Sequence, residues 1–238
     1  MKVFVIDGRI DEIRKELPGK LIVIEKSGEN KNGNDDVVTL SSGEAGNATI
    51  TFGSVRADLA DVLDFLATNY DFAALKGFSQ DEVVRLGISP EPVRSAQDAL
   101  NADEWLSLKA LIEKVKKSPE TPKCGAIGVF IGFVRELSDG RRVVKLEYEK
   151  YGDVFDRVLE EIEDELREYQ GVAEVKIHHK VGSLKPGEDI VYVVVMGEHR
   201  KDIWEPLARS MEIVKERLPV WKKEVYEDGE EWVHDKRK

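Results

Sequence analysis

The sequence predicts a two-domain protein, with an α/β domain over residues 1–117 and an α+β domain over residues 123–238. Strand and helix patterns alternate in the N-terminal half, which is typical of a small, mostly parallel sheet. In the C-terminal half, strand patterns alternate with two helix patterns, over residues 153–169 and 203–218. Two prolines in residues 118–122 interrupt both kinds of element, so we expect this segment to link the domains.

Apolar spacing indicates the elements of the N-terminal domain. Leu59, Val62, Leu63 and Leu66 recur at helical intervals, whereas residues 3–6 form a short apolar run typical of a buried strand. The expected elements are strands 3–6, 21–25, 37–40, 48–52 and 72–75, and helices 11–17, 59–70 and 102–117. The last helix directs Trp105, Leu108, Leu111, Ile112 and Val115 inward.

The C-terminal domain shows clearer strand patterns. Residues 126–135 alternate, with apolar side chains on one face and Gly128 and Gly132 on the other. Residues 190–196 are apolar on both faces, which predicts a central strand. The other expected elements are strands 143–148 and 173–182, helices 153–169 and 203–218, and a hairpin of strands 222–226 and 231–234.

Composition limits the possible functions. The net charge of −11 argues against non-specific binding to nucleic acid or to anionic membranes, although a local basic pocket stays possible. No stretch of 18 apolar residues occurs, and the N-terminal run lacks the apolar length of a signal peptide. We therefore expect a cytoplasmic protein that does not span a membrane.

Metal and disulfide chemistry is not expected either. Cys124 is the single cysteine, which leaves no disulfide framework and no cysteine-rich zinc site within one chain. The histidines show no HxH or HExxH spacing, so we predict no metal site. His179 shares its strand register with apolar residues, which favours a hydrogen-bonded core histidine over a ligand.

One lysine occupies an unexpected position on helix 203–218. At about 100° per residue, Lys215 falls within the stripe formed by the helix's apolar residues. A buried lysine is costly unless its ammonium meets an anion or a cleft. Two interpretations stay open: a functional lysine, or one whose stem packs on the stripe while its ammonium caps the helix C-terminus. The stripe comprises Trp204, Leu207, Ala208, Met211, Val214 and Leu218.

Other cations lie where anions commonly bind. His199 and Arg200 follow a buried strand and precede the helix, whose N-terminus favours anions. Asp202 is the expected N-cap, with Glu205 completing a capping box and Pro206 in the first turn.

Several segments of residues 125–234 resemble the MoaE family, the catalytic large subunits of molybdopterin synthase. The resemblance implies an α/β hammerhead fold and conversion of cyclic pyranopterin monophosphate to the molybdopterin dithiolene. Sulfur would come from the C-terminal thiocarboxylate of a small ubiquitin-like carrier with a Gly-Gly tail. The implied assembly is a homodimer within a heterotetramer, with no cofactor. The matching segments, in the family's order, are Gly125 to Ile127, Gly132 to Arg135, Leu146 to Tyr151, Ile177 to Leu184, Pro186 to Glu188, Glu198 to Arg200, and Lys215 to Glu224 with Gly229 and Trp232.

The same resemblance implies roles for five residues. Lys215 and Lys222 would be the catalytic lysines, and Arg135, His199 and Arg200 would bind the substrate. Phosphate and thiocarboxylate are both anions, so a site that holds them needs several cations. We assign Lys215 to the carrier tail and Lys222 to substrate binding and proton transfer, and we expect the five groups to converge. The chain departs from the family at His179-Lys180, where the family often has His-Arg.

Residues 61–78 are similar to MobB, the adaptor protein of molybdenum-cofactor nucleotide attachment. Lys76 stands where that family has glutamate, and no GxxxxGK[ST] phosphate loop occurs in the chain. The N-terminal domain therefore resembles a degenerate MobB-type adaptor without hydrolytic activity. Two alternatives to the enzyme stay open: a non-catalytic scaffold for cofactor-assembly proteins, and an unrelated anion-binding protein.

Overall fold

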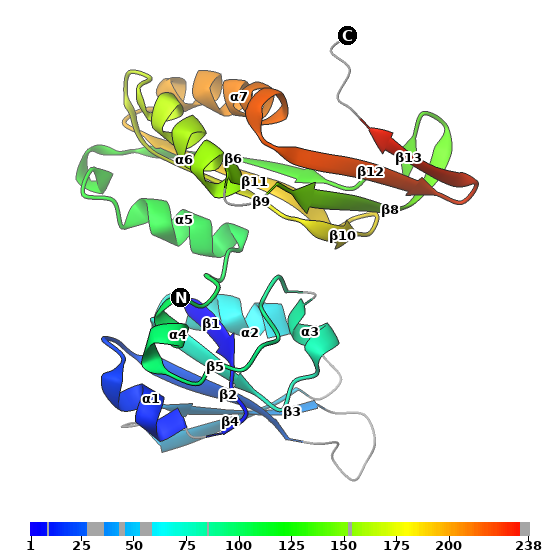
Figure 1. The fold of residues 1–238 in the computed structure, drawn as a ribbon. Coiled ribbons are helices and arrows are strands. Elements are labelled where there is room, and N and C mark those ends of the chain that lie inside the picture. Colours follow the sequence, from blue (N-terminus) through cyan, green and yellow to red (C-terminus); the bar gives the residue numbers. More distant parts are fainter. Residues whose placement is uncertain are drawn as a thin grey trace. The chain divides into compact units, whose positions relative to one another are not determined.

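The computed structural model describes residues 1–8, 10–27, 36–42, 46–52, 59–84, 86–151 and 154–233. The chain folds into two compact units, Met1–Ala110 and Leu111–Lys238 (Figure 1). Within the described ranges, no helix is long and apolar enough to cross a membrane.

The N-terminal unit is a five-stranded sheet with the strand order β1-β5-β2-β3-β4. β1, β5 and β2 are parallel, as predicted, whereas β3 and β4 extend the sheet by antiparallel pairing. Apolar residues of α1 and of α2 belong to two separate clusters, which contain alternate residues of the strands, so both sheet faces are covered. The elements are β1 Lys2–Val5, α1 Ile10–Glu16, β2 Leu21–Ser27, β3 Asp36–Ser42, β4 Gly46–Phe52, α2 Leu59–Leu66, β5 Phe72–Lys76, α3 Gln80–Val84 and α4 Ala96–Leu100.

The expected helix 102–117 is wrong in its first half, because helix α5 covers only Leu108–Lys116. The backbone before it pairs with β1 instead: the Val3 amide donates to the Asp103 carbonyl, and the Trp105 amide donates to the Met1 carbonyl. Ser107 then accepts a hydrogen bond from the Ala110 amide at 3.1 Å, which caps the first turn.

The C-terminal unit contains two antiparallel sheets. One has the order β6-β11-β9, so β11 is central, as predicted. The other has the order β10-β8-β12-β13, and its β12–β13 pair confirms the expected hairpin. The elements are the 3-10 helix η1 Thr121–Lys123, β6 Ala126–Phe133, β7 Leu137–Ser138, β8 Arg141–Lys150, α6 Val154–Arg167, β9 Val172–His179, β10 Gly182–Leu184, β11 Asp189–Gly197, α7 Arg200–Arg217, β12 Val220–Tyr226 and β13 Gly229–Val233.

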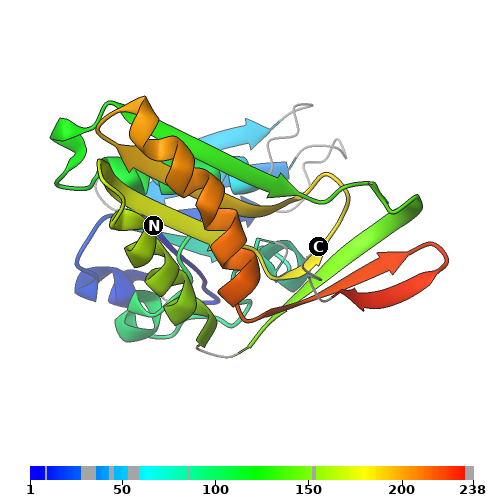
Figure 2. The same cartoon turned by 90° about the horizontal axis from the view of Figure 1, so that it is seen from above.

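Helices α6 and α7 cover one face of the three-stranded sheet (Figure 2). Val191, Val193 and Val195 of β11 pack there against both helices in the main core of this unit. A smaller cluster, which includes Val134, Tyr148 and Tyr226, forms the core of the second sheet.

Helix α7 starts three residues earlier than expected. His199 is the N-cap, and its backbone amide donates to the Asp202 carboxylate at 3.0 Å. The predicted N-cap Asp202 is therefore wrong, since this residue lies in the first turn and its charge faces the helix N-terminus. Pro206 consequently lies inside the helix instead of its first turn.

Candidate functional site

Lys215 is solvent-exposed on α7, so its predicted place on the buried face is wrong. Trp204 of the same stripe is 60% exposed, and Ala208 is exposed as well. Ser210 takes a buried position because its hydroxyl donates to the Leu207 carbonyl at 2.7 Å, which satisfies the polar group internally. The residues that α7 buries are Ile203, Pro206, Leu207, Ser210, Ile213 and Val214.

Lys222 lies on β12 in an ion pair with a buried carboxylate. Its Nζ is 2.5 Å from Oε1 of Glu224, and the Glu224 side chain also accepts a hydrogen bond from the Tyr226 hydroxyl. Glu224 is only 5% exposed. Its burial opposes ionisation, but the hydrogen bonds from Lys222 and Tyr226 outweigh that effect and lower its pKa. Glu224 therefore stays anionic and fixes the position of the Lys222 ammonium.

Tyr226 completes this polar group. Burial, together with its hydrogen bond to Glu224, raises the pKa of the Tyr226 hydroxyl to about 12. The hydroxyl therefore stays protonated and donates to the carboxylate. Sequence patterns identified neither Glu224 nor Tyr226 as a site residue, although both follow Lys222 at two-residue intervals and therefore lie on the same face of β12.

His179 is a core residue, as predicted. It is buried, and its ring packs edge-on against Tyr148 with the centroids 5.0 Å apart. Nδ1 lies 2.8 Å from the Lys180 carbonyl oxygen, and burial lowers the pKa of the imidazole. Across the described ranges, no group of three or more histidine, cysteine or acidic side chains could hold a metal ion.

Arg135 follows a residue of the apolar cluster whose member Tyr148 pairs with Lys222. It is exposed and directly follows the buried Val134, which packs with Tyr148 and Tyr226. Tyr148 is the residue that pairs with Lys222 across β8 and β12. The Val134 backbone is held in place because its amide donates to the Glu188 carbonyl at 2.9 Å and its carbonyl accepts from Gly187 at 2.9 Å.

The C-terminal end of α7 reaches this region as well. β6 and β11 are antiparallel, so the end of β6 that precedes Arg135 lies against the start of β11. α7 follows β11 and packs back along the same two strands. Val220, the first residue of β12, comes three residues after the end of α7 and packs against the cluster that contains Val134. Arg135, Lys222 and the α7 end that carries Lys215 therefore belong to one end of this unit.

His199 and Arg200 lie at the opposite end. Gly197, just before them, pairs with Ala126, whereas Asp189 pairs with Phe133. The seven-residue rise from Ala126 to Phe133 corresponds to roughly 23 Å along the strand. Along α7, the distance from Arg200 to Lys215 is about 22 Å. A single chain therefore does not bring all five predicted residues together.

Comparison with known proteins identifies related sequences. The family model described as MoaE protein matches residues 102–217. The probable molybdopterin synthase of Haloferax volcanii is 34% identical over 197 residues, which cover 75% of this chain and 76% of that protein. The molybdopterin synthase catalytic subunit of Bacillus subtilis is 41% identical over 123 residues, which cover 52% of this chain and 78% of that protein.

A solved structure is also similar. The crystal structure of molybdopterin synthase from Staphylococcus aureus matches with 38% identity and a TM-score of 0.45, covering 47% of this chain and 81% of that chain. The Haloferax alignment covers more of this chain than the C-terminal unit alone contains, so it extends into the N-terminal unit.

Proposed function

The chain belongs to the MoaE family of molybdopterin synthase catalytic subunits, and we propose that its C-terminal unit transfers sulfur at a site built around Lys215, Lys222 and Arg135. As a member of this family it is a sulfurtransferase of molybdenum cofactor biosynthesis. We assign the unit to the α/β hammerhead type and infer that the reaction takes place in the cytoplasm.

The proposed substrates are cyclic pyranopterin monophosphate and the thiocarboxylated Gly-Gly tail of a small ubiquitin-like carrier. The observation that carries this assignment is the contrast between the two lysines. Lys215 is exposed, so the tail of a second protein can reach it, whereas Lys222 is fixed against a buried carboxylate. A fixed cation suits a small substrate that must be held in one orientation.

The chemistry requires a cation at each end of the transferred sulfur. A carbon–sulfur bond forms on the pterin precursor as an oxygen substituent leaves that carbon with a proton. The acyl–sulfur bond of the carrier breaks, and water supplies the oxygen that restores the carrier carboxylate. Because the dithiolene holds two sulfur atoms, this exchange takes place twice and uses two thiocarboxylated carriers. We assign the carrier's anionic tail to Lys215, the proton to Lys222, and the substrate phosphate to Arg135, His199 and Arg200.

The proposed assembly is a homodimer with one carrier subunit per copy, forming a heterotetramer. The separation of His199 and Arg200 from Lys215 within one chain supports such an assembly, because a second copy can supply the missing cations. No nucleic acid or membrane takes part in this proposal.

The test of this function is the Lys215→Ala variant. We expect it to lose molybdopterin formation by more than tenfold when supplied with thiocarboxylated carrier and cyclic pyranopterin monophosphate. Lys117→Ala is the matched control, since Lys117 is an exposed lysine of the same unit outside the proposed site. Wild-type rates in the Lys215 variant would refute the assignment.

For the N-terminal unit we propose a degenerate MobB-like adaptor role. Three parallel strands with helices on both faces support this relation. Lys76, at the end of β5, is ion-paired with Glu25 at 2.8 Å, where a nucleotide-binding relative has glutamate. Titration with guanosine triphosphate and Mg²⁺ tests this proposal: we expect no heat of binding, and micromolar affinity would contradict it.

A further inference from the structure

We propose that Tyr226 and Arg141 are positioning residues for Lys222 and act on it through the carboxylate of Glu224. This inference rests on the proposed function, in which Lys222 binds the substrate and transfers a proton. It starts from the acidic side chains that the C-terminal unit buries. Among the described residues of this unit they are Glu163 and Glu224, and each of them is ion-paired with a lysine.

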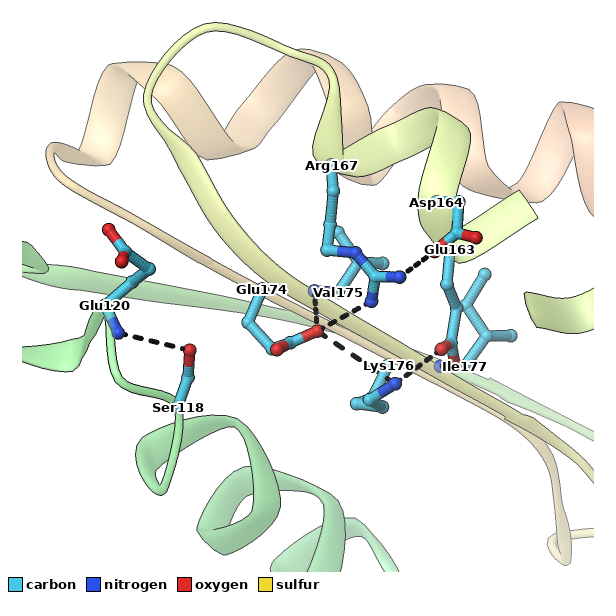
Figure 3. Close-up of polar contacts among 9 residues, drawn as sticks. All are labelled: Ser118, Glu120, Glu163, Asp164, Arg167, Glu174, Val175, Lys176 and Ile177. Carbon is cyan, nitrogen blue, oxygen red and sulfur yellow. Dashed lines mark hydrogen bonds and ion pairs between the residues drawn. The ribbon is translucent and has the colours of Figure 1, made fainter. Parts of the chain in front are cut away.

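The Glu163 carboxylate has a structural role (Figure 3). One of its oxygens accepts a hydrogen bond from the Ile177 amide at 2.7 Å, and the other lies 2.6 Å from Nζ of Lys176. Since Ile177 belongs to β9, an edge strand of its sheet, this bond attaches α6 to the strand and satisfies a backbone donor. Glu163 therefore shows what a buried carboxylate does when it serves the fold alone.

Glu224 is held by side chains of its own strand. Its Oε1 lies 2.5 Å from Nζ of Lys222, and its Oε2 accepts a hydrogen bond from the Tyr226 hydroxyl. All three residues lie on the same face of β12, because they follow each other at two-residue intervals. Each oxygen of the carboxylate has its own partner, so the Tyr226 hydroxyl fixes the direction in which Glu224 faces the Lys222 ammonium.

A second carboxylate competes for the same hydroxyl. Glu231 lies directly opposite Glu224 in the antiparallel pair of β12 and β13, so two negative charges share one face of the sheet. Oε1 of Glu231 is 3.4 Å from the Tyr226 hydroxyl oxygen, while Glu224 is closer to it. A rotation of the Tyr226 O–H would transfer its hydrogen bond from Glu224 to Glu231, and the orientation of Glu224 would then be lost.

Arg141 resolves this competition in favour of Glu224. Its Nη1 lies 3.6 Å from Oε2 of Glu231, and its Nη2 lies 2.8 Å from Oδ1 of Asp228 in the turn between the two strands. The guanidinium carbon lies 3.7 Å from the centre of the Tyr226 ring, so the same cation also packs on that ring. Arg141 thereby neutralises Glu231 and fixes the tyrosine, which leaves the hydroxyl for Glu224.

This arrangement matters for proton transfer. A lysine ammonium sits on a flexible four-carbon stem, whereas a proton donor must lie within hydrogen-bond distance of the atom that it protonates. An ammonium whose counter-ion is fixed keeps one position. Loss of the Tyr226 hydroxyl should therefore affect the step that Lys222 carries out, and not the capture of the carrier tail by Lys215.

Tyr226→Phe tests the first part of the proposal, because it removes the hydroxyl and keeps the ring that Arg141 contacts. We expect kcat for molybdopterin formation to fall by about fivefold, whereas KM for the thiocarboxylated carrier stays within about twofold of wild type. Circular dichroism verifies that the variant is folded. An unchanged kcat would overturn the role of Tyr226.

The pH profile separates positioning from a merely structural role. Burial raises the pKa of Glu224, but hydrogen bonds lower it below its ordinary value of 4.5. Without the Tyr226 hydroxyl this pKa rises, so acid removes the charge of Glu224 at a higher pH. We therefore expect the acid limb of kcat to move to higher pH in Tyr226→Phe, and an unmoved limb would overturn the proposal. The groups that face this carboxylate are Lys222, Tyr226, Ser138, Arg141 and Glu231.

A pair of substitutions tests the second part. Arg141→Met removes the charge that neutralises Glu231, and we expect kcat to fall by about fivefold. Adding Glu231→Gln removes the competing charge, so the double variant should recover kcat to within about twofold of wild type. No recovery in the double variant would overturn the role of Arg141.

Glu163→Gln is the matched control, since it also neutralises a buried carboxylate that is paired with a lysine. We expect a lower Tm, with kcat within about twofold of wild type and an unmoved acid limb. If Glu163→Gln lost as much kcat as Tyr226→Phe, the inference would be overturned, because any weakening of the unit would then reduce turnover. Wild-type kcat in Lys222→Ala would instead refute the proposed function, so the two failures are distinguishable.

Discussion

Replacing Glu224 by glutamine tests how the buried carboxylate supports Lys222. The substitution keeps the side-chain shape but removes the negative charge that the Lys222 ammonium faces at 2.5 Å. It also removes the charged acceptor of the Tyr226 hydroxyl. Lys222 then loses a charge-assisted hydrogen bond, and the side chain at position 224 is almost inaccessible to water, since Glu224 is only 5% exposed.

The cost follows from the burial of the two partners. Breaking a fully buried pair destabilises a protein by about 3–5 kcal/mol. Lys222 keeps partial access to solvent and can reorient, so we expect about 2 kcal/mol, the range of a hydrogen bond to a charged group. For a protein of this size that corresponds to a decrease in Tm of roughly 4–8 °C.

The dependence on pH gives a sharper criterion. The pKa of Glu224 in the folded protein lies below its ordinary value of 4.5, so its stabilising effect is fully present above pH 4.5. The effect is lost as the pH falls through the lowered pKa, because the wild-type carboxyl then becomes neutral like the glutamine. The difference in Tm between wild type and variant should therefore be largest at pH 7 and shrink toward acid.

Thermal unfolding followed by circular dichroism at pH 7 and at pH 4 measures this difference, and molybdopterin formation at pH 7 measures catalysis. We expect activity to fall by about tenfold or more as Lys222 loses its fixed orientation. Equal Tm values at pH 7 would refute the inference that Glu224 is an ionised partner of Lys222.

Two further predictions concern neighbouring residues. Lys222→Ala should reduce kcat strongly in the synthase assay, whereas Lys223→Ala should change kcat by less than twofold. Lys223 points to the other face of the sheet, and its ammonium is paired with Glu230 at 2.8 Å. Equal losses of kcat in both variants would contradict the assignment. The stability of His179→Phe should fall less in acid than the stability of wild type. Burial lowers the imidazole pKa below 6.5 in the folded protein, so the unfolded wild-type chain binds a proton that the folded chain does not, and acid favours unfolding. Urea midpoints at pH 7.5 and 5.5 measure this effect, and an equal decrease in both proteins would count against it.

The sequence by itself determined the type of most elements and the family. The apolar run of residues 190–196 identified β11 as a central strand, and β12 and β13 were expected as a hairpin, because such patterns depend on local spacing. The candidate cations were also identified from the sequence, through spaced segments that resemble the MoaE family.

Only the tertiary structure decided which way these elements face. Periodicity describes how residues are arranged around one helix, but neighbouring elements select the side that is buried. On α7, α6 and the sheet bury Pro206, Ser210 and Ile213, which leaves Trp204 and Lys215 exposed. The antiparallel pairing of β6 with β11 likewise places Arg135 and His199 at opposite ends of these strands, a separation that no local pattern in the chain encodes.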